Sequence, residues 1–269
     1  MKIYSNHISS NEIYKKFYDL NHINMSVFVD YTPQNISELS EINFISLQEP
    51  NEYFGMHDWV IKNNKMFSAI LTWSDKILNT CENSIFLPFG HTWFKKEQYE
   101  KNINKEFNVA HLRGRLYKTY GHTLRYELFD RQSEIKMKKT FYDVYGDRYN
   151  IEEARIGKEY VFGSSQFNIA IENTQHNGYF TEKIIDCFLL KSIPIYWGCS
   201  NIDEFFDING IITFTSVDDV IRKINNLNEN YYNQRLDCIN KNYELALKYI
   251  DYIDNIKQKI VEILKNNNL

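Results

Sequence analysis

The sequence predicts an α/β protein built from two Rossmann-like halves that face a cleft. Short apolar runs rich in β-branched and aromatic residues recur along the chain, and segments with helical spacing lie between them. Strands that alternate with helices favour parallel sheets whose two faces are covered. The chain has 269 residues, of which 43% are hydrophobic, enough for one large domain or two small ones.

The first hundred residues supply one of these halves. A helix is expected over 10–20. Strands are expected at 26–31, 42–48, 67–73 and 84–90. The stretch 95–107 is charged and nearly free of strand signal, so it is the expected linker. The sequence therefore predicts a first domain over 1–100 and a second domain over 101–269.

The second half repeats the alternation. Strands are expected at 107–112, 140–146, 167–173, 192–198 and 210–214. Helices are expected at 121–132, 181–191 and 216–227, and the pattern is helical from about Tyr231 to near the end. The stretch 242–265 carries apolar residues near helical spacing with lysines between them. Such a helix more often covers a sheet or packs across two domains than lies on a membrane surface.

Composition and charge argue against several broad classes of function. The net charge of −4 and the pI near 6.0 show no basic surplus of the kind that nucleic-acid binders have. The four cysteines lie far apart without a C-x-x-C pair, so neither a zinc site nor a disulfide framework is indicated. The sequence has neither a secretory signal pattern nor an apolar run of roughly 18 residues. We therefore expect a cytoplasmic protein without a transmembrane segment, for which peripheral contact with a membrane stays open.

The densest group of hydrogen-bonding residues follows the expected strand 167–173. Glu172 and Asn173 stand at the end of that strand, and Thr181 is the expected N-cap of the next helix. Ligands of open α/β sheets bind beyond the carboxyl ends of the strands, where a helix N-terminus favours anions. Lys183 adds a positive charge, and Glu182 can accept hydrogen bonds from a sugar hydroxyl. Together these groups suit a nucleotide diphosphate, although either short motif alone is an ordinary cap or turn.

The spacing of the whole stretch 171–198 is more specific than its parts. It reads IENTQHNGYFTEKIIDCFLLKSIPIYWG and resembles the donor-binding signature of the α-1,3/4-fucosyltransferases, glycosyltransferase family 10. Their motif runs approximately F-E-N-S/T-x4-Y-x-T-E-K, then a helix, then I/V-P-I/V-x-x-G. Ile171 stands where the family often has Phe, and the resemblance is strong over about 165–215. It implies a GT-B fold, a GDP-fucose donor, inversion at the anomeric carbon and a C-terminal helix that returns to the first domain.

The resemblance also assigns roles to residues of the signature. Its glutamate matches Glu182, expected near the ribose, and its lysine matches Lys183, expected on the diphosphate. Its tyrosine matches Tyr179, expected near the nucleotide or the sugar. Glu172 and Asn173 match the E-N pair, for which fucose contact and loop support both stay open. The second domain would then bind the donor and the first would face the acceptor.

Basic residues before the signature could stabilise the departing diphosphate, because charge develops on it as the glycosidic bond breaks. The stretch 111–132 contains Arg113, Arg115, Lys118, His122 and Arg125. The family supplies a phosphate-binding arginine from the region before the E-N pair, and Arg148 is its preferred counterpart with Arg125 as second choice. Solvated surface arginines are the alternative interpretation, and His122 is more typical of a helix cap than of a catalyst.

An inverting transfer needs a general base on the acceptor hydroxyl. Glu49 follows the expected strand 42–48, and Pro50 disfavours helix at that position, so an extended carboxylate is expected at the edge of the sheet. The family similarly places an acidic residue after a strand of the first domain. Glu52 is the nearby alternative, and an ordinary surface glutamate is the competing interpretation. Weaker candidates are Asp75 and His91, the latter in a loop with Trp93 that could line the acceptor site.

The sequence as a whole predicts a fucosyltransferase that moves fucose from GDP-fucose to a hydroxyl of an oligosaccharide or other glycan acceptor by a single displacement. No metal or cofactor is expected, because Asp218 and Asp219 fall in a helix-start pattern rather than in a D-x-D motif. Two alternatives stay open. One is a transferase that uses another nucleotide sugar on the same scaffold, and the other is a non-catalytic nucleotide- or glycan-binding module.

Overall fold

The computed structural model describes residues 1–6, 9–143 and 151–267. Contacts divide the chain into two compact units. The first unit comprises 1–89, 177–179 and 251–269, and the second unit comprises 90–176 and 180–250. The division therefore falls between Phe89 and Gly90 rather than at residue 100, and two later segments belong to the first unit.

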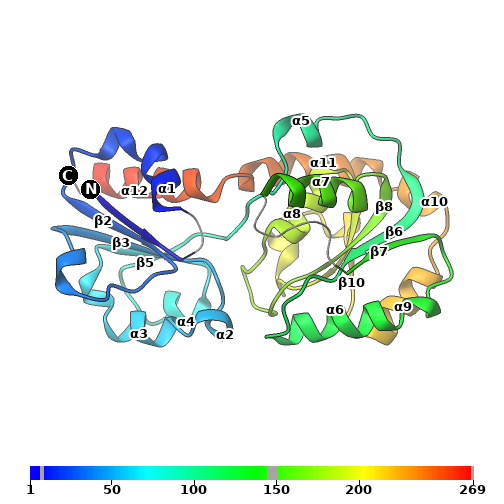
Figure 1. Ribbon diagram of the computed structural model, residues 1–269, viewed down its shortest axis with the longest axis horizontal. Coiled ribbons are helices and arrows are strands. Elements are labelled where there is room, and N and C mark those ends of the chain that lie inside the picture. Colours follow the sequence, from blue (N-terminus) through cyan, green and yellow to red (C-terminus); the bar gives the residue numbers. More distant parts are fainter. Residues whose placement is uncertain (7–8, 144–150, 268–269) are drawn as a thin grey trace. The chain divides into compact units, whose positions relative to one another are not determined.

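The first unit contains a parallel sheet with the strand order β1-β2-β3-β4-β5 (Figure 1). Its strands are β1 (Lys2–Ser5), β2 (Met25–Val29), β3 (Ile42–Leu47), β4 (Ala69–Thr72) and β5 (Ser84–Phe86). Its α-helices are α1 (Ser10–Lys16), α2 (Asn51–Phe54), α3 (His57–Lys62), α4 (Asp75–Leu78) and α12 (Tyr252–Asn266). The four strands expected in this half are present, and β1 is an additional edge strand too short to give a clear sequence signal.

Both faces of this sheet are apolar, because successive side chains of a strand point to opposite faces. Val27 and Val29 pack in a cluster with α1 and α12, whereas Phe28 packs in a second cluster with α3 and α4. Figure 1 shows α1 and α12 on one side of the sheet and the other helices on the opposite side. Helix α12 contributes Ile256 and Ile260 to the first cluster. The expected return of the C-terminal helix to the first domain is therefore confirmed.

The second unit contains another parallel sheet, with the order β10-β9-β8-β6-β7. Its strands are β6 (Glu106–Leu112), β7 (Lys139–Tyr142), β8 (Ser165–Ile171), β9 (Ile193–Trp197) and β10 (Ile212–Thr213). Its α-helices are α5 (Lys96–Tyr99), α6 (Tyr120–Asp130), α7 (Ile151–Phe162), α8 (Glu182–Leu189), α9 (Val217–Asn225), α10 (Asn230–Asn233) and α11 (Leu236–Ala246). In Figure 1, α6 and α9 lie on one side of this sheet, and α7, α8 and α11 lie on the other.

The strand order of the second unit reverses between β6 and β8. After β6 the chain forms β7 on one side, and it then returns to form β8 on the other side of β6. Such a reversal is the topological switch point at which open α/β sheets bind ligands, beyond the carboxyl ends of the strands. The stretch that begins at Glu172 follows β8 and so starts at this place.

The fold class predicted from the sequence is confirmed, and the differences are local. The expected linker 95–107 contains α5 and the start of β6. Helix α7 was not expected from the sequence. Among the described helices, none is both long enough and apolar enough to span a membrane. The cytoplasmic location stays a prediction.

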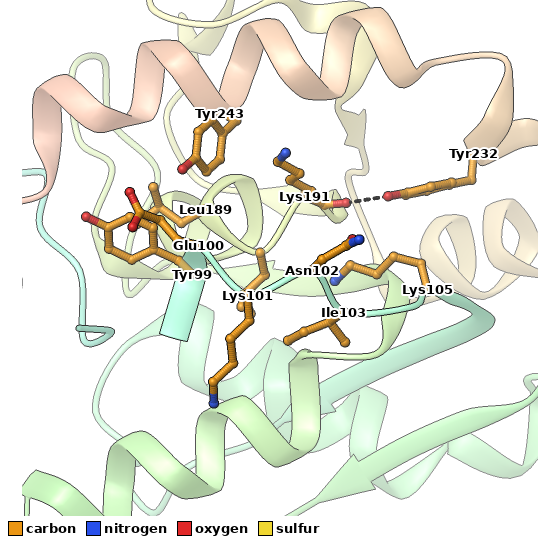
Figure 2. A pocket seen from close by; sticks show the side chains of 11 residues that line it. Tyr99, Glu100, Lys101, Asn102, Ile103, Lys105, Leu189, Lys191, Tyr232 and Tyr243 are labelled. Carbon is orange, nitrogen blue, oxygen red and sulfur yellow. Dashed lines mark hydrogen bonds between the residues drawn. The ribbon is translucent and has the colours of Figure 1, made fainter. Parts of the chain in front are cut away.

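A cavity of about 460 Å³ lies in the second unit where β6 and β9 begin, at the edge of the sheet opposite Glu172 (Figure 2). Leu189 and Lys191, at the end of α8, line it together with Lys105, which precedes β6. The ammonium group of Lys105 donates to the carbonyl of Gly163 and, at 3.0 Å, to Ser192 Oγ. Burial lowers the pKa of Lys105 from 10.5 to about 7.

The lowered pKa of this half-buried lysine predicts a pH-dependent stability. The unfolded chain holds the proton up to about pH 10 and the folded chain only to about pH 7, so the folded state gains stability as pH rises between these values. From pH 6.5 to 9.5 we expect the wild type to gain roughly 3 kcal/mol relative to Lys105→Met. Urea unfolding of both proteins across this range measures the difference, and parallel curves would contradict the burial of an ionisable lysine here.

Candidate functional site

Glu172, the first residue after β8, is a completely buried carboxylate. Its Oε1 accepts from the Thr181 amide at 2.8 Å, and its Oε2 accepts from Thr181 Oγ1 at 2.7 Å. Lys183 Nζ lies 3.3 Å from Oε2. Burial raises the pKa of Glu172, while the charge of Lys183 and the two hydrogen bonds oppose the rise. Glu172 thus joins the end of a strand to the start of α8.

The start of α8 is capped as predicted. Thr181 is the N-cap, and its hydroxyl oxygen accepts from the Lys183 amide at 3.4 Å. The Lys183 ammonium group lies 3.0 Å from that same hydroxyl oxygen and 3.3 Å from Glu182 Oε1. Lys183 therefore stands at the helix N-terminus between the carboxylates of Glu172 and Glu182, where the helix dipole also favours an anion.

Glu182 is surrounded by positive or potentially positive groups. Besides Lys183, Lys158 Nζ lies 4.0 Å from Oε1 and His91 Nδ1 lies 4.0 Å from Oε2. Burial alone would raise the pKa of Glu182, but the charges of Lys183, Lys158 and His91 and a hydrogen bond from Thr181 hold it well below its usual range. Burial lowers the pKa of His91, against the pull of neighbouring carboxylates. Glu182 is therefore a fixed, ionised acceptor.

Asp186, one turn further along α8, ties the loop at the start of the second unit to this helix. Its Oδ1 accepts from Thr92 Oγ1 at 2.6 Å and lies 3.3 Å from the Trp93 amide. Its Oδ2 accepts from Lys158 Nζ at 2.8 Å, and that ammonium group lies 5.5 Å from the centre of the Trp93 ring. His91 and Trp93, expected to line an acceptor site of the first domain, thus belong to the second unit beside the signature.

Lys158 is a site residue that the sequence interpretation missed. It lies on α7, a helix without a sharp sequence pattern, and its side chain is 15% exposed. The available signal was a lysine on the helical connection immediately before the strand that carries the E-N pair. The two carboxylates of Glu182 and Asp186 suggest that a further cation lies nearby. The sequence does not identify it as Lys158, because α7 and α8 come together only in the fold.

Asn173 and Arg125 form a clamp beneath the strand end. The guanidinium group of Arg125 donates from Nε and Nη2 to the carbonyl of Ile171, at 3.0 and 2.6 Å, and from Nη2 to Asn173 Oδ1 at 2.9 Å. Arg125 is 8% exposed. These contacts tie Asn173 to the strand end, and the role of Arg125 as a phosphate ligand stays a prediction.

Two glycines make room for Glu172. A Cβ atom on Gly121, at the start of α6, would lie 1.8 Å from the carbonyl oxygen of Glu172. A Cβ atom on Gly198, the last glycine of the signature, would lie 2.4 Å both from Cγ of Glu172 and from the hydroxyl oxygen of Tyr196. The spacing between E-N and the final glycine of the signature therefore has a steric cause.

The other basic candidates before the signature have local partners or are exposed. Arg113 Nε donates to Asp143 Oδ1 at 2.7 Å, and its guanidinium group stacks 4.1 Å from the centre of the Tyr126 ring. His122 Nδ1 accepts from the Thr119 amide at 3.1 Å, so it acts as a helix cap. Arg115 and Lys118 are exposed. Arg148, the preferred phosphate ligand, lies outside the described residues and stays a prediction.

In the first unit, Glu49 follows β3 as predicted. It is half-buried, whereas Glu52 on α2 is exposed. Pro50 is the N-cap residue of α2 with an extended ψ of 156°, and the chain bends at Glu49. Asp75 begins α4 and accepts from Asn177 Nδ2 at 2.9 Å. Glu49 therefore stands at the carboxyl edge of this sheet, and its role as the base stays a prediction.

Tyr179 belongs to the first unit together with Asn177 and Gly178, whereas the other residues of the signature belong to the second unit. Its side chain is completely buried, and its ring centre lies 4.7 Å from that of Trp73, the residue after β4. Its expected place near the nucleotide or the sugar stays a prediction.

Gly198→Ala should destabilise the protein by about 1–3 kcal/mol, because the added methyl group overlaps Glu172 and Tyr196. The shift is measured as a lower urea midpoint with an unchanged slope. Ser200→Ala, at an exposed position two residues further on, is the control. Equal midpoints for the two variants would contradict the steric role of the glycine.

Comparison with known proteins shows the family. The sequence model of glycosyltransferase family 10 (fucosyltransferase), C-terminal part, matches residues 94–265. A stretch of 121 residues is 31% identical to the α-(1,3)-fucosyltransferase FucT of Helicobacter pylori, and it covers 45% of this chain and 20% of that protein. The matched region thus spans about a fifth of the length of this relative.

Solved structures show a similar fold. A crystal structure of an α1,3-fucosyltransferase with GDP-fucose aligns with a TM-score of 0.56 and 17% identity, over 98% of this chain and 88% of that one. HepE of Anabaena in complex with UDP-glucose aligns with a TM-score of 0.58 and 14% identity, over 94% of this chain and 82% of that one. These likenesses support the GT-B type of α/β fold. Because the family match covers well over half of the sequence, the chain belongs to glycosyltransferase family 10 (fucosyltransferase).

Proposed function

We propose that this protein transfers fucose from GDP-fucose to a hydroxyl group of a glycan acceptor with inversion at the anomeric carbon. The observation that carries the proposal is the cluster at the start of α8, where Lys183 is fixed between Glu172 and Glu182 in the family's signature. A solved α1,3-fucosyltransferase of similar fold contains GDP-fucose. The donor proposed here follows from the family and from this geometry together.

The diphosphate of the donor would bind at the N-terminus of α8. The helix dipole attracts an anion there, and Lys183 adds a full charge. When the bond between the sugar and the diphosphate breaks, negative charge grows on the departing GDP. Cationic groups already in place stabilise that charge without reorganisation, which lowers the barrier to departure.

Glu182 suits the ribose of the nucleotide. Its carboxylate is ionised over the whole neutral range, and Lys158, Lys183 and His91 hold it in place. An ionised carboxylate accepts hydrogen bonds from sugar hydroxyl groups more strongly than a neutral acceptor does. A fixed acceptor also loses little side-chain entropy when the nucleotide binds.

In the proposed mechanism, Glu49 is the general base. The acceptor hydroxyl oxygen attacks the anomeric carbon of fucose from the face opposite the diphosphate while Glu49 takes its proton. The new glycosidic bond forms as the bond to the diphosphate breaks, and GDP leaves with the bonding electron pair. One displacement inverts the configuration. We propose that no metal ion takes part and that the protein acts in the cytoplasm.

The alternative donor is another nucleotide sugar on the same scaffold. The observation that favours it is the comparable structural likeness to HepE, which was solved with UDP-glucose. Thermal-shift measurements with GDP, GDP-fucose, GDP-mannose and UDP-glucose discriminate between the donors. We expect the largest rise in Tm with the two fucose-relevant ligands, GDP and GDP-fucose, and a smaller rise for Lys183→Met, with EDTA making no difference. Stabilisation by UDP-glucose alone would refute the fucose donor.

Glu49→Gln tests the base and the non-catalytic alternative together. The amide keeps the shape of the side chain but cannot take a proton, so kcat for transfer should fall by about 10²–10⁴-fold while GDP binding is retained. Glu52→Gln is the matched control and should keep most of the activity. A glycan array with labelled GDP-fucose supplies the acceptor. Tight GDP binding without turnover on any acceptor would instead favour a binding module.

A further inference from the structure

The backbone that carries Glu49 is held on every side. The Gln48 amide donates to Asp30 Oδ1 at 2.8 Å, and the Glu49 amide lies 3.3 Å from both carboxylate oxygens of Asp30. The indole of Trp73 donates to the Gln48 carbonyl at 2.6 Å. His57 Nε2 lies 3.3 Å from the Glu49 carbonyl and donates to it in the tautomer protonated there. All four backbone polar groups of this dipeptide therefore have partners.

Asp30 has two features that call for an explanation. It is 1% exposed, so its carboxylate is almost fully removed from water, which costs free energy unless donors replace the water. Its φ of 44° lies in the left-handed region, which residues other than glycine adopt only at a cost, with Asp and Asn the best tolerated. The burial of Asp30 and its left-handed backbone both accompany one arrangement, in which its carboxylate lies against the amides of Gln48 and Glu49.

The three residues involved stand at the same edge of the sheet. Asp30 follows β2, Gln48 follows β3 and Trp73 follows β4, and these strands are parallel neighbours. Their carboxyl ends consequently lie side by side, and the hydrogen bonds run across the ends of three adjacent strands. The dipeptide of Gln48 and Glu49 is thus hydrogen-bonded to residues from both neighbouring strands. Residues of the same loop could not supply these contacts.

Tyr179 connects the signature to this group of hydrogen-bonded residues, because its ring packs against Trp73. Its ring packs 4.7 Å from Trp73 between ring centres, and His57 lies against the same indole at 5.9 Å. The indole is 2% exposed, so its direction is set by packing. Tyr179 thus helps to keep the N–H of Trp73 on the carbonyl before Glu49.

We infer that Asp30, assisted by Trp73, is the positioning residue for the base of this transferase. The inference rests on the proposed function, since it assigns no new chemistry but fixes where the carboxylate of Glu49 stands. Pro50 already disfavours helical backbone at Glu49. Asp30 further restrains the backbone there by holding two successive amides with one carboxylate. A base displaced by about 1 Å loses roughly 10²-fold in rate, so this restraint decides kcat rather than donor affinity.

Four variants test the inference. Asp30→Gly removes the acceptor and suits a φ of 44°, whereas Asp30→Asn keeps Oδ1, the oxygen that faces both amides. Trp73→Phe removes the indole N–H and keeps an aromatic ring against Tyr179. Trp59→Phe is the matched control, because Trp59 is a half-buried tryptophan of the same unit that packs on Phe67. For each variant, kcat, KM for GDP-fucose and Tm are measured.

We expect Asp30→Gly and Trp73→Phe to lower kcat by about tenfold or more, with KM for GDP-fucose within about twofold of wild type. Asp30→Asn should recover most of the loss, and Trp59→Phe should match wild type. If Asp30→Gly fails to fold, Trp73→Phe and Asp30→Asn still decide.

Wild-type kcat in Asp30→Gly and Trp73→Phe, or an equal loss in Trp59→Phe, would overturn the inference. Absence of transfer by the wild-type protein would refute the proposed function itself. Full activity in Glu49→Gln would remove the base, and with it the task assigned to Asp30.

Discussion

A single buried carboxylate, that of Glu172, organises the second unit's site. A charge with no contact to water is tolerated only where donors replace the water, and here Thr181 supplies two of them and Lys183 a third contact. The strand end and the helix start are thereby locked at one spacing. Gly121 and Gly198 leave the volume that this carboxylate and its backbone occupy. The strand end, the helix cap and the two glycines, which are separate motifs in the sequence, thus pack together around Glu172.

The cluster around this carboxylate alternates in sign. Lys183 contacts Glu172 and Glu182, and Lys158 contacts Glu182 and Asp186. Each long lysine side chain is held by two carboxylates, which fixes the position of its ammonium group before any ligand binds. Preorganised charge of this kind is what stabilises a leaving group without solvent reorganisation. The acidic residues of α8 thus orient the cations.

Much of this arrangement could be predicted from the sequence, because it depends on local order along the chain. The strand before Glu172, the cap at Thr181 and the turn at Pro50 each follow from rules that involve a few neighbouring residues. Lys158 could not be found in that way, since its contact with α8 comes from a crossover that brings two distant helices together. Likewise, nothing near Arg125 reveals that its guanidinium group holds Ile171 and Asn173.

The division of the chain was also beyond local rules. The start of the second unit was expected at residue 101, but Asp186 on α8 binds the loop at Thr92 and so draws residues from 90 onward into that unit. Such long-range contacts outweigh the linker-like composition of 95–107. Composition indicates which segments are polar, but tertiary contacts decide to which unit a segment belongs.

The return of α12 to the first unit has a consequence for how the protein is made. The cluster of β2 that contains Val27 and Val29 is closed by Ile256, Ile260 and Leu264, which leave the ribosome more than two hundred residues later. The first half of the chain therefore has one face of its sheet only partly covered, by α1, while the second unit, whose residues run from 90 to 250, is synthesised. Vectorial synthesis should complete the later unit first and the earlier unit last, with chaperone demand concentrated on that open apolar face.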